Sequence, residues 1–186
     1  MKRFAIGVDL GGTNLRVAAV NDAGALLDKL TLDTRSREPR ESVIREMCEA
    51  IQTLREKLAG EGQLAGIGVG VPGIIYRESG TLRQSPNLPG WENFPVRQEI
   101  ESLLRTRVWL DNDANVAALG EFWLGAGKAH PSLCMVTLGT GVGGGLILDG
   151  KIWRGFLGFA GEPLMNWRKK ENLIRYKSYC WNSSDH

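Results

Sequence analysis

The sequence predicts an α/β fold: a mixed sheet flanked by helices, followed by the beginning of a second, similar lobe. Strand-like runs at 3–9, 14–20 and 25–32 follow one another across short turns, which indicates an antiparallel meander. Helices and strands then alternate, as in a sheet covered by helices. Further on, a strand, a glycine turn and a strand come again. The chain has 186 residues, 42% of them hydrophobic, so it can bury a core.

Apolar spacing places the first helix and the central strand. A helix is predicted after Pro39, because apolar residues recur every three or four positions until Gly60 and Gly62 end the pattern. The run 64–71 consists largely of apolar residues and glycines and predicts a buried central strand. The apolar positions of the helix are Val43, Ile44, Met47, Ile51, Leu54 and Leu58.

A short helix at 96–104 and a strand at 107–110 follow a polar loop, and a further helix begins after Asp111-Asn112-Asp113. A break at 125–131 precedes a hairpin that begins at Leu133. We therefore expect one lobe over 1–126, the start of a second over 127–162, and an atypical tail over 163–186. On the last helix we expect the buried side to hold Ala114, Ala117, Ala118, Leu119, Phe122 and Trp123.

Charge and cysteine content narrow the class of protein. A net charge of +2 gives no reason to expect nucleic acid or a membrane surface as partner. The tail differs from the rest, with five Lys or Arg residues against two acids. Cys48, Cys134 and Cys180 are isolated, which favours neither a disulfide framework nor a zinc site and indicates a reducing cytoplasm. We expect no signal peptide and no membrane span.

Two glycine loops are the most informative motifs. The first is Asp9-Leu10-Gly11-Gly12-Thr13-Asn14 and the second occupies 137–145, each between two apolar runs. Backbone N–H groups in such turns can converge on an anion, and glycine permits positive φ and close approach of a ligand. Two loops together predict a phosphate held from both sides.

Single residues in these loops have two interpretations. Asp9 ends a strand where its carboxylate could hold a hydrated Mg²⁺ beside nucleotide phosphates, or it could close an Asx turn. Thr13 and Thr140 could donate hydroxyl hydrogen bonds to a phosphate or serve ordinary turn chemistry.

Asp111-Asn112-Asp113 offers more capping groups than one helix needs. A carboxylate at this strand end could accept a proton from a substrate hydroxyl during phosphoryl transfer. We expect the helix N-terminus to lower the pKa of this carboxylate, which would keep it ionised but make it a weaker base.

Other polar groups at strand ends and in loops could bind the hydroxyls of a sugar, namely Gly73, Asn87, Asn112 and Glu162. Alternatively, Gly73 and Asn87 belong to proline-associated turns and Glu162 is a solvated surface acid. Trp91 could line the site or anchor its loop. Neither His130 nor His186 has a partner that indicates catalysis or metal binding.

Six segments, in order along residues 3–162, together resemble motifs of the ROK family, which comprises repressors, uncharacterised reading frames and sugar kinases. The resemblance implies the actin-like ATPase, or ribonuclease H-like, fold. The segments are Gly7-Val8-Asp9-Leu10-Gly11-Gly12-Thr13-Asn14, Gly70-Val71-Pro72-Gly73, Asn87-Leu88-Pro89-Gly90-Trp91, Asn112-Asp113-Ala114-Asn115, 138–145 and Gly155-Phe156-Leu157-Gly158-Phe159-Ala160-Gly161-Glu162.

The resemblance also implies a reaction and its residues: phosphorylation of a hexose, most simply glucose, by ATP with Mg²⁺. Asp113 would be the catalytic base and would also contact the sugar, together with Gly73, Asn87, Asn112 and Glu162. The first phosphate loop would comprise Asp9, Gly11, Gly12, Thr13 and Asn14, and the second Gly139, Thr140, Gly141, Val142 and Gly143. Complete family members are expected to form dimers or tetramers.

The position of the first strand bears on the branch of the family. Family repressors place a DNA-binding module before the first strand, whereas here that strand starts at Arg3, which favours the kinase branch.

The chain departs from the family pattern after residue 162. Where family kinases continue to Gly-His and a zinc-binding cysteine cluster, this chain continues with Pro163. We expect a truncated or frame-altered kinase with impaired activity. The alternatives are a non-catalytic sugar-binding or regulatory fragment and an actin-like ATPase without sugar specificity.

Overall fold

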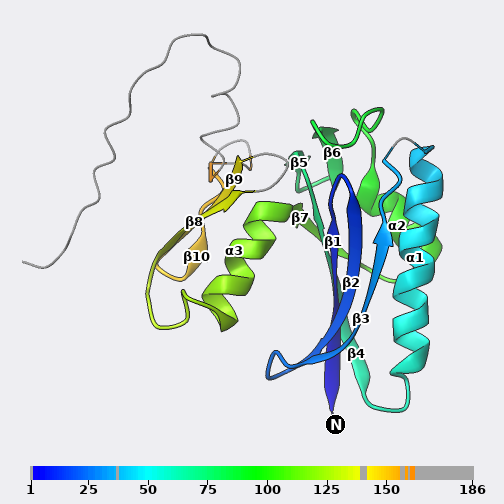
Figure 1. Cartoon of the computed structure of the whole chain (residues 1–186), viewed down its shortest axis with the longest axis horizontal. Coiled ribbons are helices and arrows are strands. Elements are labelled where there is room, and N and C mark those ends of the chain that lie inside the picture. The colour runs from blue at the N-terminus through cyan, green and yellow to red at the C-terminus, as the bar shows by residue number, and fades with distance from the viewer. Residues whose placement is uncertain (1, 37, 139–141, 156–157, 159, 162–186) are drawn as a thin grey trace, which may run out of the picture.

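The computed structural model describes residues 2–36, 38–138, 142–155, 158 and 160–161 (Figure 1). Its largest sheet has the strand order β3-β2-β1-β4-β7. The antiparallel meander predicted from the sequence is present, and β4 and β7 lie parallel to β1. The sheet is therefore mixed, as predicted. Its strands are β1 (Arg3–Leu10), β2 (Asn14–Asn21), β3 (Leu26–Asp33), β4 (Gln63–Val71) and β7 (Trp109–Asn112).

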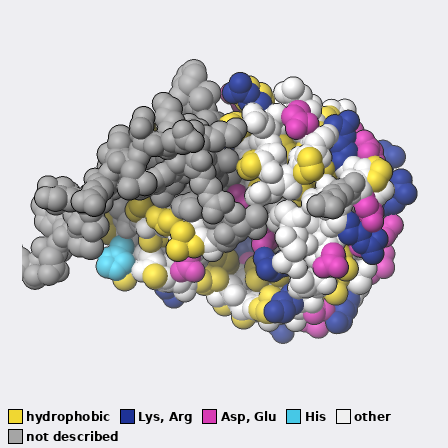
Figure 2. All heavy atoms as spheres, turned by 45° about the horizontal axis from the view of Figure 1, so that its top comes forward, with side chains coloured by type: hydrophobic (Ala, Val, Ile, Leu, Met, Phe, Trp, Pro, Cys, Tyr) yellow, Lys and Arg dark blue, Asp and Glu magenta, His cyan; other side chains and the backbone are white. Residues whose placement is uncertain are grey.

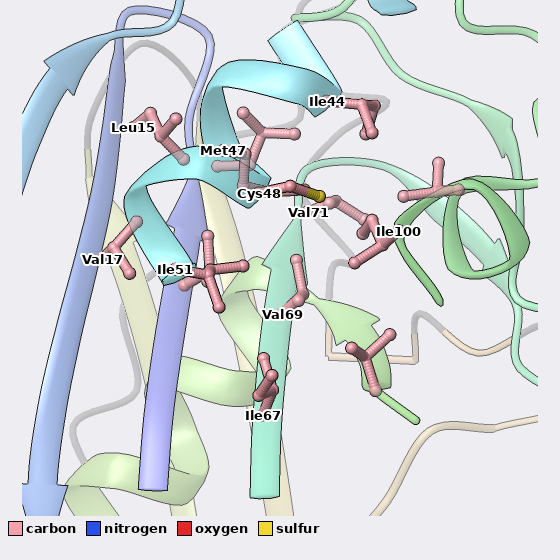
Figure 3. Close-up of a cluster of buried hydrophobic side chains, with 14 of the residues drawn as sticks. Leu15, Val17, Ile44, Met47, Cys48, Ile51, Ile67, Val69, Val71 and Ile100 are labelled. Carbon is pink, nitrogen blue, oxygen red and sulfur yellow. The ribbon is translucent and has the colours of Figure 1, made fainter. Parts of the chain in front are cut away.

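Helices cover both faces of this sheet. α1 (Arg40–Lys57) and α2 (Val96–Leu104) lie on one side, and α3 (Asp113–Leu124) lies on the other (Figure 1). The apolar stripe predicted for the first helix faces the sheet, where Ile51 and Met47 of α1 meet Val17 of β2 and Val69 of β4 (Figure 3). Cys48 belongs to this core, and burial raises the pKa of its thiol to about 11, so it stays protonated at neutral pH.

Two smaller sheets flank the large one. The order β10-β9-β8 comprises β8 (Leu133–Leu138), β9 (Val142–Leu148) and β10 (Lys151–Ile152). The predicted polar loop after β4 contains a hairpin of β5 (Ile74–Tyr76) and β6 (Thr81–Gln84). These strands are only three and four residues long, too short for a clear alternation of polar and apolar residues.

Helix α3 packs between β4 and β9, and the buried side predicted for it is only partly right. Ala114 and Ala118 are buried and Phe122 is half-buried, but Ala117, Leu119 and Trp123 are exposed. The sequence of α3 is apolar around most of its circumference, so periodicity could not select the contact side. The selection comes from β9: a Cβ on Gly145 would lie 2.8 Å from the Ala114 carbonyl oxygen, so glycine lets the strand touch the helix backbone.

Acidic and basic side chains are interspersed on the face of the molecule shown in Figure 2. None of the helices in the described part of the chain is both long enough and apolar enough to cross a membrane.

Candidate functional site

The candidate site lies where the parallel strands β1, β4 and β7 end. Asp9 is paired in register with Gly70, and Gly70 with Asp111, so the three form one row across the sheet. A Cβ on Gly70 would lie 3.4 Å from the Cα of Asp113, so the start of α3 rests against the end of β4. Ligands of open α/β sheets bind at such carboxyl ends.

Asp113 is the first residue of α3. Burial raises the pKa of its carboxyl, and the negative charge of Asp9 raises it further. The hydrogen bond of 2.9 Å that Oδ1 accepts from the Ala114 backbone N–H acts in the opposite direction. The predicted lowering by the helix N-terminus is therefore wrong, because desolvation outweighs the backbone donors. A raised pKa makes Asp113 a stronger base than an ordinary aspartate.

Asn112 supplies the helix cap among the three candidates. Its Oδ1 accepts a 3.0 Å hydrogen bond from the Asn115 backbone N–H, and its Nδ2 donates to the Gly73 carbonyl oxygen at 3.2 Å. Gly73 has φ +113°, and a Cβ there would collide with the Gln84 carbonyl oxygen. The turn after β4 and the start of α3 are thereby fixed to each other.

The first glycine loop is compact for a different reason than the one predicted. The described glycines with positive φ do not include Gly11 or Gly12. Glycine instead allows close packing, since a Cβ on Gly12 would lie 3.1 Å from the Cβ of Asn87, which is tighter than an ordinary contact. The Gly11 N–H closes the hairpin on the Asn14 carbonyl oxygen at 2.9 Å.

The same loop leaves donors available to a ligand. Within the described residues, the N–H groups of Gly12 and Thr13 have no backbone acceptor. Two such donors in a tight turn fit a phosphate oxygen. The loop thus suits a phosphate group, although the N–H of Gly11, one of the residues predicted for the phosphate loop, is already used.

Thr34 supports the first glycine loop through two hydrogen bonds, a role that was not predicted from the sequence. Its side chain is fully buried, and its Oγ1 donates to the Gly11 carbonyl oxygen at 2.7 Å. Its backbone N–H donates to the Thr13 carbonyl oxygen at 2.8 Å. No local pattern marks a threonine just after a strand as the support of a loop 23 residues earlier.

Thr34→Val should lower the free energy of unfolding by about 1–3 kcal/mol, because it leaves the Gly11 carbonyl oxygen without its hydroxyl donor. Urea unfolding measures the loss. Thr53→Val is the matched control: its hydroxyl bonds a helix carbonyl in an exposed position, and we expect a change below about 0.5 kcal/mol. Equal losses in the two variants would contradict the role given to Thr34.

Asp9 pairs with Arg16 rather than closing an Asx turn. Arg16 Nη1 lies 2.9 Å from Asp9 Oδ2, and the two residues face each other in the β1–β2 register. About half of the Asp9 side chain is exposed. With Asp113 close enough for its pKa to respond to Asp9, two carboxylates share this edge, a donor set that suits a hydrated Mg²⁺.

The loop around Asn87 is anchored by aromatic packing. Asn87 is half-buried beside Gly12, whereas Trp91 is fully buried in an edge-to-face contact with Phe94 at 5.3 Å between ring centroids. The Arg40 guanidinium lies 4.3 Å above the Phe94 ring and donates to the Gly90 carbonyl oxygen at 3.0 Å. Trp91 is therefore the anchor of this loop and does not line the site.

Part of the predicted site lies outside the described residues: Gly139, Thr140, Gly141 and Glu162. The side chain of Val142 is likewise not described, and Gly143 pairs with Thr137 in the β8–β9 register. Within the described ranges, no group of three or more His, Cys, Asp or Glu side chains is arranged to hold a metal ion.

Comparison with known proteins decides the family. The model of the ROK family matches residues 5–163. The chain belongs to the ROK family. A glucokinase of Thermotoga maritima is 43% identical over 157 residues, which are 84% of this chain and 48% of that protein. A xylose repressor of Caldicellulosiruptor bescii is 37% identical over 158 residues, again 84% of this chain and 39% of the repressor.

Solved structures agree with this assignment. The ROK family glucokinase of Streptomyces griseus, determined in complex with glucose and AMPPNP, superimposes with a TM-score of 0.77 at 33% identity. The match covers 86% of this ROK chain and 49% of that protein. The chain thus has part of the actin-like fold of ROK sugar kinases and spans half or less of the length of these relatives.

Proposed function

We propose that this ROK chain supplies the sugar-binding and phosphate-binding half of an ATP-dependent hexose kinase that converts glucose to glucose 6-phosphate. The observation that supports this most directly is the position of Asp113, a carboxyl of raised pKa beside the first glycine loop and the Asn112–Gly73 contact. A base, the polar groups of Asn112 and Gly73 and a phosphate loop at one sheet edge suit transfer of a phosphoryl group to a hydroxyl.

In this proposal Asp113 accepts the proton of the reacting sugar hydroxyl. Gly73, Asn87, Asn112 and Glu162 hydrogen-bond the other hydroxyls. The N–H groups of Gly12 and Thr13, with Asn14 and the loop 139–143, hold phosphates, and Asp9 holds Mg²⁺ through water. ATP with Mg²⁺ supplies the phosphoryl group when bound.

A sugar-binding regulator is the second candidate. The 37% identity to a xylose repressor supports it, since that relative belongs to the same family without being named a kinase. Both candidates use the same sugar residues and differ in whether Asp113 performs chemistry.

The two candidates separate in one experiment on the purified chain. Calorimetry with glucose and coupled turnover of ATP and glucose are measured for the wild type and for Asp113→Asn. We expect the wild type to bind glucose saturably and to turn over more slowly than the T. maritima glucokinase. This turnover should disappear in Asp113→Asn. Glucose binding without Asp113-dependent turnover would favour the regulator, and absence of glucose binding by the wild type would overturn both candidates.

A further inference from the structure

The Asp111 carboxylate is bonded to several separate parts of the chain. It is 14% exposed. Oδ1 accepts hydrogen bonds from the Asn112 backbone N–H at 2.9 Å and from Asn115 Nδ2 at 3.3 Å. Oδ2 accepts from Arg154 Nε at 2.8 Å, and Arg154 Nη2 lies 2.7 Å from it. Both oxygens are therefore engaged with donors of the protein itself.

These donors connect α3 to the chain that follows β10. We call residues 153–155, 158 and 160–161 the return segment. Its internal contact is a 2.9 Å hydrogen bond from the Ala160 N–H to the Arg154 carbonyl oxygen, and Asn115 Nδ2 donates to the Gly158 carbonyl oxygen at 3.2 Å. At its end, a Cβ on Gly161 would lie 2.8 Å from the Gly145 Cα, so the return segment ends against β9.

Burial distinguishes this ion pair from the others on the surface. Arg154 is 23% exposed, whereas the Arg3–Asp22 pair at 3.4 Å leaves both side chains 59% exposed. Exposed pairs contribute little, while a charge-assisted hydrogen bond supported by a second close ion contact onto one shielded carboxylate oxygen is among the stronger polar contacts in proteins. Arg77, from the turn between β5 and β6, approaches the same oxygen at 3.9 Å.

We propose that Asp111 is a positioning residue. It clamps the return segment against the start of α3 and so fixes Asn112 and Asp113, which directly follow it in the chain and belong to the proposed sugar site. The clamp stands on the described contacts alone, and its effect on sugar affinity rests on the proposed function.

Hydrogen exchange of the full chain tests the clamp without any ligand. The variants are Asp111→Asn, which keeps the shape of the side chain, Arg154→Met, and the double variant; Asp22→Asn is the matched control at the exposed pair. In each clamp variant the Ala160 amide should exchange about tenfold faster or more, while amides of β1 and β4 keep their rates. The double variant should equal the single ones, since each of them breaks the same Asp111–Arg154 ion pair.

Several results would overturn the clamp: an unchanged Ala160 rate, an equal rise across β1 and β4, additive effects, or the same rise in Asp22→Asn. Calorimetry with glucose then tests the positioning role. Affinity should fall about tenfold in Asp111→Asn and be partly restored in Arg154→Lys relative to Arg154→Met. Faster exchange with unchanged affinity would overturn the positioning role. If the wild type binds no glucose, the proposed function fails and exchange alone decides the clamp.

Discussion

Asp113→Asn is expected to lower phosphoryl transfer by about 10²–10⁴-fold and, at neutral pH, to leave the free energy of unfolding unchanged or higher. The rate falls because an amide cannot accept the proton of the sugar hydroxyl. Stability is preserved because the asparagine Oδ1 can still accept from the Ala114 N–H, while a carboxylate disfavoured by burial and by Asp9 is removed. Coupled turnover and urea unfolding of the same preparations measure the two effects.

The stability difference between Asp113→Asn and the wild type should depend on pH. Because the folded-state pKa of Asp113 is raised, the ionised carboxylate penalises the folded state at neutral pH. The penalty is lost as the pH falls through the folded-state pKa to below the unfolded value of about 3.9. The advantage of Asp113→Asn should therefore be largest near neutrality and vanish in acid. A variant less stable than the wild type at neutral pH would contradict the assignment of Asp113 as a chemical rather than a structural residue.

Gly73→Ala is expected to cost about 2–5 kcal/mol of unfolding free energy, a larger loss than that of Thr34→Val. Its φ of +113° disfavours any residue with a Cβ, and that Cβ would collide with the Gln84 carbonyl oxygen. The turn must then shift, and with it the carbonyl oxygen that accepts from Asn112 Nδ2. Glucose affinity should fall together with stability.

Gly90→Ala is the matched control, because Gly90 also has a positive φ, +82°, but a Cβ there would meet no atom within 4 Å. It should cost only the backbone strain, about 1–2 kcal/mol. Urea unfolding of both variants separates the strain from the collision. Equal losses would mean that the collision with the Gln84 carbonyl oxygen adds nothing to the backbone strain.

The fold was largely predictable because its strands and first helix have clear periodicities. The alternation of buried and exposed residues along β1 and the apolar stripe of α1 both place side chains in the core. Figure 3 shows the part of this core that α1 forms. The exposed side of α3 was not predictable, since its sequence is apolar around the helix and the choice depends on Gly145 of a distant strand. Periodicity describes one element at a time, whereas this choice needs two.

The candidate site shows the same division. Residues from motifs far apart in the sequence do lie together: Gly12 lies beside Asn87, and Asn112 bonds Gly73. Their roles toward a ligand remain predictions. The prediction of positive φ in the first loop was wrong, because neither Gly11 nor Gly12 has it and Gly12 instead packs closely against Asn87. Thr34 and Arg154 were missed, since each bonds a residue 23 or 43 positions away and has no local pattern around it.

The side chains of Asp111, Asn112 and Asp113 are consecutive but bond different parts of the molecule. Asp111 and Asn112 hold distant elements together, whereas the Asp113 carboxylate accepts from the backbone of the next residue. Folding and the proposed chemistry are thus assigned to separate neighbours in one tripeptide. If Asp113 is the base, a single base change in its codon removes the proposed proton acceptor while the contacts of Asp111 and Asn112 still hold the fold, so a sugar-binding protein without kinase chemistry is one substitution away.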